Sequence, residues 1–358
     1  MAVTVRKGMP SAELDRETFA QRFRARFHDP QFANRQDDIE RLLDAAWEIY
    51  KQHRKAPRTQ PAGQGYADPS YELPVEWLAT RDAVHAAEAR QTDANAPSRV
   101  LVINGSSRSD QTCPGEMSKT YRLARIAEDT IADHPGFEVD FLDLSHLTSE
   151  RDRIIYPCKA CVSTAMPLCH WPCSCYPNHS LGQVNDWMNE LYPRWVAAHG
   201  VMILCPVNWY QVPSPLKLMI DRLVCADGGN PDPSSTHGKD PERAKAIELA
   251  GWDYPRHLAG RVFSVVVHGD SEGVDEVRRL LHDWLANMRL VPAGKLAQVG
   301  SYIGYEKPYA TSHDDLDADD AVQEEVRNAA RAIVAGVALM RRNMLERPDA
   351  GLIEPRQK

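Results

Sequence analysis

This sequence has neither an excess of positive charge nor an apolar run long enough to cross a lipid bilayer. Its 42 Lys and Arg residues are outnumbered by 50 Asp and Glu residues, so the formal net charge is −8. A chain with that balance lacks a general electrostatic footprint for nucleic acid. Residues 1–23 contain no apolar core of signal-peptide length, and the apolar stretch 332–340 is too short to span a membrane. We therefore expect a cytoplasmic protein that binds neither nucleic acid nor membranes.

The two best-known glycine fingerprints for nucleotide phosphates are also missing where the first buried strand is expected. Residues 99–120 read RVLVINGSSRSDQTCPGEMSKT. This is not the G-x-G-x-x-G of dinucleotide sites, nor the G-x-x-x-x-G-K-[ST] of nucleoside triphosphate sites. The β-branched run 100–103 predicts a strand buried on both faces, which Asn104 and Gly105 end.

Hydroxyl and cationic side chains follow that strand, around the start of a predicted helix. An anion is favoured there, because the first N–H groups of a helix have no partner and carry partial positive charge. The candidate phosphate ligands are Ser106, Ser107, Arg108, Ser118, Lys119 and Thr120. The alternative interpretation is a serine-rich connection with an N-cap and no ligand. Since the dinucleotide and triphosphate patterns are absent, phosphomonoester binding remains, and FMN is the commonest such ligand on a doubly wound sheet.

The first 95 residues differ in texture from the rest of the chain. They are rich in Ala, Arg, Gln, Asp and Glu, and their apolar residues have helical spacing. We predict a helical extension over 1–95, either a packing or dimerisation arm or a loop that wraps over another part of the chain. An FMN-binding domain over 96–345 follows, with an insertion at 227–258 and a tail at 346–358.

Strand and helix patterns alternate after residue 98, which is typical of a parallel α/β sheet. The predicted strands are 100–105, 138–144, 200–207, 262–269 and 295–300. The predicted helices are 117–133, 182–199, 215–226, 273–288 and 319–343. Right-handed crossovers then favour a flavodoxin-like, doubly wound five-stranded sheet of order 2-1-3-4-5. Ligands of such sheets bind beyond the carboxyl ends of the strands.

Two further strand-end loops are candidates for the ligand. The loop after the third strand places two aromatic rings and an amide between prolines, where a planar ring system could stack. Its residues are Pro206, Val207, Asn208, Trp209, Tyr210 and Gln211. The loop after the fourth strand contains His268, Gly269 and Asp270, whose glycine allows close approach of the backbone. The alternatives are aromatic rings that cap the core and a histidine that is merely hydrogen-bonded.

Five of the eight cysteines gather after the second predicted strand. They are Cys158, Cys161, Cys169, Cys173 and Cys175. Iron and zinc both accept thiolate ligands, and a C-x-x-C pair is a common half of either site. A [4Fe–4S] cluster, a zinc ion that His170 or His179 completes, and reduced or redox-active thiols all remain open.

Residues 99–222, and more loosely the chain to about residue 300, resemble the NAD(P)H-dependent FMN reductases of the flavodoxin-like superfamily. That family's G-S-x-R loop is matched at 105–108. Its P-[VI]-Y-W-x₆-L-K-x-x-[IL]-D-R stretch is matched by Pro206, Val207, Trp209, Leu216, Lys217, Ile220, Asp221 and Arg222. Asn208 replaces the family tyrosine, and the loop 109–117 is longer than usual. Iron–sulfur flavoproteins of the same fold carry C-x-x-C-x-x-C here, but Thr164 stands at the third cysteine.

The resemblance implies an enzyme in which NAD(P)H gives hydride to FMN N5 and the reduced flavin then reduces a small acceptor. A quinone, a nitro compound or a free flavin would serve as acceptor. The alternative is an electron carrier that uses FMN and a cysteine-ligated iron–sulfur cluster. The Pro- and Gly-rich insertion at 227–258 favours a covered pocket and hence the enzyme. The resemblance also leads us to expect a homo-oligomer.

Overall fold

The chain divides into two compact units, each with its own packing. The computed structural model describes residues 3–52, 56–113, 115–176 and 186–345. One unit, here called the sheet unit, comprises Asp82–Pro157, Trp187–Asp227 and Pro255–Lys358. The other, here called the cysteine unit, comprises Met1–Arg81, Cys158–Asp186 and Gly228–Tyr254. The predicted FMN loops therefore belong to the first unit, and the five clustered cysteines belong to the second.

The sheet unit contains the predicted parallel sheet. Its strands are β3 (Ser98–Asn104), β4 (Phe137–Asp143), β5 (Gly200–Pro206), β6 (Val262–Gly269), β7 (Val291–Pro292) and β8 (Gln298–Tyr302). They run in the order β4-β3-β5-β6, and both β7 and β8 pair with β6 in parallel. The order 2-1-3-4-5 is thus confirmed for the predicted strands, with β8 as the fifth, but the sheet has six strands because the two-residue β7 was not predicted. The last strand was predicted three residues too early, because Gly294, with a φ of 107°, leads into the 3-10 turn η5 (Lys295–Ala297).

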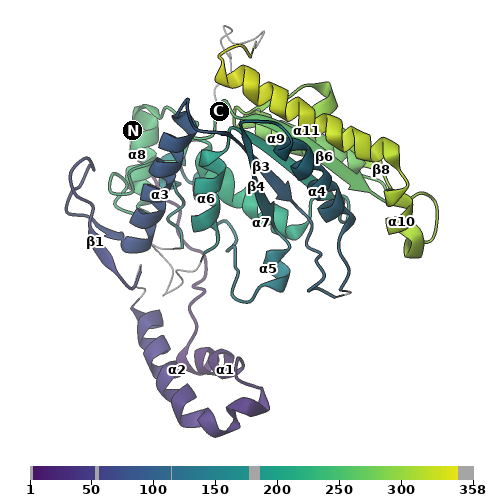
Figure 1. The fold of residues 1–358 in the computed structure, drawn as a ribbon. Helices are drawn as coiled ribbons and strands as arrows, with labels where there is room; N and C mark the ends of the chain where they lie inside the picture. The colour runs from purple at the N-terminus through teal and green to yellow at the C-terminus, as the bar shows by residue number, and fades with distance from the viewer. Residues whose placement is uncertain (1–2, 53–55, 114, 177–185, 346–358) are drawn as a thin grey trace. The chain divides into compact units, whose positions relative to one another are not determined.

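Helices cover both faces of this sheet (Figure 1). On one face, α4 (Lys119–Ala132) and α11 (Asp320–Arg341) pack against alternate strand residues such as Val100, Val102 and Met202. The other face carries α6 (Met188–Ala197), α7 (Ser214–Arg222) and α9 (Val274–Asn287). There the rings of Trp195 and Trp284 lie 6.0 Å apart, which joins α6 to α9. The short elements of the unit are α5 (His146–Ser149), η4 (Leu223–Ala226), η6 (Tyr309–Thr311) and α10 (Ser312–Asp317).

Local capping explains where the predicted helices differ from those in the structure. The helix predicted from residue 117 begins at Lys119, because the Ser118 hydroxyl caps it by accepting from the Tyr121 N–H at 3.0 Å. The helix predicted over 182–199 is observed as the shorter α6: residues 186–187 and 198–199 are not helical, and residues 182–185 lie outside the described chain. None of the helices that the structure describes is long and apolar enough to cross a membrane.

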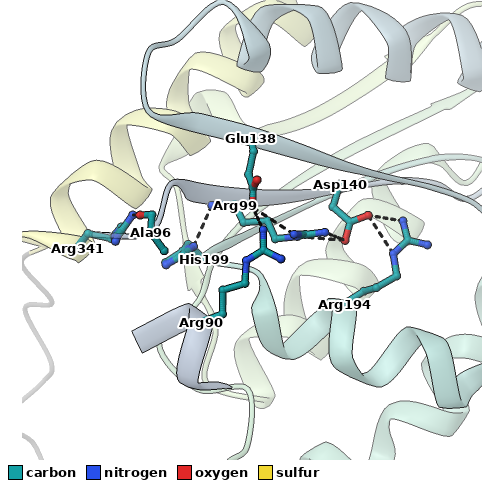
Figure 2. Close-up of polar contacts among 8 residues, drawn as sticks. All are labelled: Arg90, Ala96, Arg99, Glu138, Asp140, Arg194, His199 and Arg341. Atoms are coloured by element: carbon teal, nitrogen blue, oxygen red, sulfur yellow. Dashed lines mark hydrogen bonds and ion pairs between the residues drawn. The ribbon is translucent and has the colours of Figure 1, made fainter. Parts of the chain in front are cut away.

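A network of paired charges closes the amino-terminal end of the sheet (Figure 2). Arg99, near the start of β3, reaches Asp140 at 2.9 Å and Glu138 at 3.2 Å, and Arg194 Nε reaches the other oxygen of Asp140 at 3.0 Å. His199 Nδ1 accepts the Arg99 N–H at 2.9 Å, which requires an unprotonated Nδ1. Burial, reinforced by the charge of Arg341, lowers the pKa of His199 to about 4.

The cysteine unit combines the N-terminal helices with loops from later in the chain. Its elements are α1 (Arg16–Arg24), η1 (Pro30–Arg35), α2 (Gln36–Lys51), β1 (Thr59–Pro61), β2 (Glu72–Pro74), η2 (Cys161–Ser163), η3 (Met166–Leu168) and α8 (Pro241–Gly251), and α3 (Val75–Thr92) begins in it. The Phe19 ring packs 5.3 Å from that of Trp47, which joins α1 to α2. Trp77 is fully buried and donates its indole N–H to the Pro172 carbonyl at 2.9 Å. The extension, the cysteine segment and most of the insertion thus form one packed unit.

Candidate functional site

The carboxyl end of β3 lies so close to β5 that only glycine fits at position 105. A Cβ on Gly105 would lie 2.9 Å from the Cys205 Cβ and 3.1 Å from the Leu204 carbonyl oxygen. Both atoms belong to a buried strand and cannot move aside cheaply. The backbone at Gly105 therefore passes close to β5. The residues that follow it, together with the start of α4, form a cradle at the carboxyl edge of the sheet.

Side chains at the end of β3 and β4 fix the path of this first loop. The buried Asn104 donates to Asp143 at 2.9 Å and accepts the Ser106 N–H at 3.2 Å. Ser106 is buried and accepts the Arg108 N–H at 3.1 Å. The carbonyl of Ser107 accepts from Thr148 at 2.6 Å. Asn104 and Asp143 were missed from the sequence, although an Asn-Gly pair at a strand end was a usable signal.

The start of α4 forms the other side of the cradle. The first-turn N–H groups of Lys119 and Thr120 have no acceptor within the helix, so they are available to an anion. Lys119 is half-buried, and burial lowers its pKa while the nearby Asp270 opposes that change. Lys119, Thr120 and the positive end of the α4 helix dipole thus lie together at this point.

Two of the predicted ligands make other contacts. Arg108 donates to the backbone oxygen of Glu116 at 3.0 Å and pairs with its carboxylate at 2.5 Å. The buried His268 shares a 2.7 Å hydrogen bond with the hydroxyl of Thr120. Burial, with the charge of Lys119, lowers the pKa of His268 to about 3. His268 is therefore neutral at physiological pH and joins β6 to α4, so we find no acid–base role for it.

The loop after β5 is a tight turn that holds two aromatic residues in an unusual backbone conformation. Asn208 and Gln211 exchange backbone hydrogen bonds of 2.8 and 3.0 Å. Between them, Trp209 and Tyr210 have φ values of 46° and 62°. Left-handed backbone costs a residue with a side chain roughly 1 kcal/mol. Trp209 is 93% exposed and Tyr210 59% exposed, so burial does not offset that cost.

The three strand-end loops converge on one another. The Val207 N–H donates to the His268 carbonyl at 2.9 Å, which joins the second loop to the third. Gly273 has a φ of 103°, and a Cβ there would lie 3.3 Å from the Tyr210 Cα. With the bond between Thr120 and His268, all three loops form one continuous rim. Asp270 is exposed on that rim. The structure therefore brings together the three segments that the sequence singled out.

The five clustered cysteines lie in the cysteine unit, and Cys175 hydrogen-bonds to both Cys161 and Cys173. Cys169, Cys173 and Cys175 are buried, whereas Cys158 and Cys161 are half-exposed. In the described part of the chain, no group of three or more Cys, His, Asp or Glu side chains is arranged to hold a metal ion. Both ring nitrogens of His170 are occupied, by Ser174 at 2.5 Å and Thr236 at 2.8 Å. His179 lies outside the described residues. The geometry therefore gives no support to a zinc or iron–sulfur site.

Comparison with known proteins gives one family and several more distant similarities. The model of a family described as NADPH-dependent FMN reductase matches residues 98–302. The iron–sulfur flavoprotein of Methanosarcina thermophila is 25% identical over 126 residues, which are 35% of this chain and 52% of that protein. The chain thus matches about half the length of this curated relative.

Solved structures give weaker similarities. One is RosB with bound 8-demethyl-8-formylriboflavin-5′-phosphate, at 14% identity over 70% of this chain and 81% of that one, with a TM-score of 0.43. Another is an FMN-dependent NADH-azoreductase from Bacillus anthracis in complex with FMN. It is 14% identical, the match covers 65% of this chain and 98% of that one, and the TM-score is 0.36.

Proposed function

Because this chain belongs to the NADPH-dependent FMN reductase family, we propose that it is an FMN-dependent oxidoreductase that takes hydride from NAD(P)H and reduces a small molecule. The observation that carries the proposal is the convergence of three strand-end loops around the cradle at Gly105. Ligands of doubly wound sheets bind at this edge. The family match gives no position for a flavin, and the three converging loops support a position at this edge of the sheet.

The first loop suits a phosphomonoester. Ser106 and Ser107 supply hydroxyls, and the first turn of α4 supplies N–H groups and the ammonium of Lys119. A phosphate dianion at this point would gain from the helix dipole and from a half-buried cation. Arg108 would add a second cation only by exchanging its bond to Glu116 for one to the phosphate.

The second loop suits a flat ring system. The turn at 208–211 is rigid, because its two backbone bonds and the packing of Gly273 against Tyr210 hold it. Its exposed aromatic rings offer stacking surface to a planar partner. We therefore propose a planar acceptor such as a quinone, an aromatic nitro compound or a free flavin.

The chemistry itself requires little of the chain. When bound, FMN supplies the hydride and electron transfer, so no protein nucleophile is needed. The residues at the loops bind and orient, and the neutral His268 keeps the rim together through Thr120. This division of roles explains why the rim contains hydroxyls, N–H groups and rings rather than a catalytic acid and base.

The proposal is tested by the FMN content and activity of the purified chain. Ser106→Ala and Lys119→Met should each weaken FMN binding roughly tenfold, since each removes one contact to the phosphate worth about 1.4 kcal/mol. FMN dissociation constants are measured by fluorescence titration, and NAD(P)H oxidation is followed with a quinone and with a nitro compound. Matched controls are Ser11→Ala and Lys51→Met, which alter exposed residues of the cysteine unit.

Each outcome bears on the proposal. Loss of FMN in the two cradle variants, with the controls unchanged, supports it. Equal FMN affinity in all four variants would overturn the phosphate assignment. The electron-carrier alternative remains a prediction from the sequence. It would be favoured over the enzyme if anaerobically purified protein contained iron and if no acceptor supported NAD(P)H oxidation.

A further inference from the structure

Two cysteines of the cysteine unit lie closer together than their spacing in the sequence suggests. The Sγ atoms of Cys161 and Cys175 are 3.1 Å apart. Cys161 begins the turn η2, whereas Cys175 lies 14 residues later in the segment that ends at Tyr176. The sequence alone pairs Cys161 with Cys158 in a C-x-x-C pattern, whereas the structure adds a hydrogen bond from Cys161 to the distant Cys175. The fold therefore gives Cys161 a second possible disulfide partner.

A lysine from the insertion provides the positive charge beside these thiols. Lys239 Nζ donates to the Leu168 carbonyl at 2.7 Å, and its charge acts on Cys161, Cys169, Cys173 and Cys175. Burial lowers the pKa of Lys239, but thiolates outweigh burial and the net direction is upward. A desolvated ammonium is stabilised by a nearby anion, and here the nearby groups able to become anions are thiols.

The two sulfur atoms are not equivalent. Cys175 is buried and hydrogen-bonds to Cys161, which is half-exposed. That hydrogen bond, aided by Lys239, lowers the pKa of Cys161 to about 7 and raises the pKa of Cys175. A reactive cysteine is typically a partly exposed thiolate in an electropositive setting, with a resolving thiol beside it. Cys161 fits the first description and Cys175 the second.

We propose that Cys161 and Cys175 are a redox-active thiol pair that closes to an intramolecular disulfide by exchange with a low-molecular-weight disulfide. The Cys161 thiolate attacks one sulfur of R–S–S–R, which forms a mixed disulfide and releases one thiolate. Cys175 then loses its proton to solvent and attacks the Cys161 sulfur, which releases the second thiolate. The pair loses two electrons and two protons, and the reagent leaves as two R–SH molecules. The two Sγ atoms must approach by only about 1 Å to reach the length of a disulfide.

This activity belongs to one unit and does not depend on the flavin proposal. Cys161, Cys175 and Lys239 all lie in the cysteine unit. Cys173 also hydrogen-bonds to Cys175, but no group of three or more ligands among the described residues is arranged to hold a metal ion. The two explanations therefore predict different behaviour toward a thiol–disulfide buffer.

The test uses the full-length chain, purified without oxygen and equilibrated at pH 7 with mixtures of reduced and oxidised glutathione. Free thiols are then blocked with N-ethylmaleimide, and the peptides are mapped by mass spectrometry. We expect oxidising mixtures to produce a peptide crosslinked between Cys161 and Cys175, which reduction reverses. Cys175→Ser should accumulate one glutathione on Cys161, and Cys161→Ser should form neither product. Cys113→Ser, which alters an exposed cysteine of the sheet unit, is the control and should crosslink normally.

Three results would overturn the proposal. One is full alkylation of both cysteines in every mixture, and another is a crosslink between Cys158 and Cys161. The third is stoichiometric zinc or iron that protects Cys161 and Cys175 until a chelator removes it. FMN content is measured in the same samples, so that failure of the thiol pair is separated from failure of the flavin site. If the chain binds FMN but forms no crosslink between Cys161 and Cys175, only the thiol-pair proposal is overturned.

Discussion

The two ends of the sheet in the sheet unit are built from opposite kinds of interaction. At the amino-terminal end, the charged side chains are paired, and Asp140 lies between Arg99 and Arg194 (Figure 2). At the carboxyl end, Trp209 and Tyr210 are exposed on left-handed backbone. Paired, buried charge holds strands in place, whereas strained and exposed groups lower stability. We therefore interpret the first end as structural, and we propose that a ligand bound at the second end offsets the cost of its conformation.

The two ends should therefore respond differently to substitution. A substitution at the amino-terminal end should lower the free energy of unfolding and leave FMN affinity unchanged. A substitution at the exposed turn should lower FMN affinity without lowering the free energy of unfolding. Three measurements test the contrast, from the largest expected effect to the smallest.

Asp140→Asn should lower the free energy of unfolding by about 3 kcal/mol, because it leaves two partly buried guanidinium groups without their shared carboxylate. Urea denaturation measures the change. The control is Asp221→Asn, which breaks an exposed pair with Lys217 and should cost less than about 1 kcal/mol. An Asp140 variant as stable as the control, or one that is stable but loses FMN, would break the contrast.

Protonation of His199 should destabilise the same end in acid. Its pKa is about 4 in the folded protein, against an ordinary value of 6.5. The unfolded chain therefore binds the proton first, so the stabilisation is complete above pH 6.5 and is lost as the pH falls toward 4. Between pH 7.5 and pH 4.5 the loss should be about 2.5 kcal/mol.

Urea denaturation at pH 7.5 and pH 4.5 measures this pH effect. His199→Gln keeps an acceptor and a donor but does not titrate, so its stability should change less with pH than that of the wild type. His268 has a lowered pKa too and acts in the same direction in both proteins. The exposed His28 provides the control, as His28→Gln. Equal pH dependence in wild type and His199→Gln would argue against a neutral His199.

Trp209→Gly should raise the free energy of unfolding by about 0.5 kcal/mol, since glycine adopts positive φ without strain and little buried surface is lost. FMN or acceptor affinity should fall, because the exposed ring is removed. Asp152→Gly replaces another residue of positive φ, and should give the gain in stability with no change in FMN affinity. If the Trp209 variant binds FMN and acceptors like the wild type, the Trp209 ring is not part of the binding site.

Much of the sheet could be predicted from the sequence. The strands β3, β5 and β6 are short apolar runs bounded by polar or glycine-containing segments, and a buried parallel sheet, with helical patterns between the runs, accommodates them. The segment 295–297 was assigned to a strand in error, because the positive φ of Gly294 is a property of the folded backbone. The candidate loops were also found from the sequence, because parallel strands place their carboxyl ends at one edge.

Partners within the loops could not be predicted in the same way. Neither the bond between Thr120 and His268 nor the pairing of Arg108 with Glu116 has a characteristic spacing. Lys239 lies in a charged, Pro- and Gly-rich insertion, where nothing marks it as the neighbour of cysteines some 70 residues earlier. Such contacts depend on how separate segments pack, which local patterns do not record.

The sequence by itself therefore determined the parallel sheet, the order of its strands and the three loops at its carboxyl end. Periodicity and strand-end composition are local properties, and a parallel sheet brings the loops that follow its strands to one edge. Only the tertiary structure decided that His268 is a buried neutral link, that Cys161 contacts Cys175, and that Lys239 supplies positive charge beside them. Burial and distance between segments govern protonation and reactivity, and both exist only once the chain has folded.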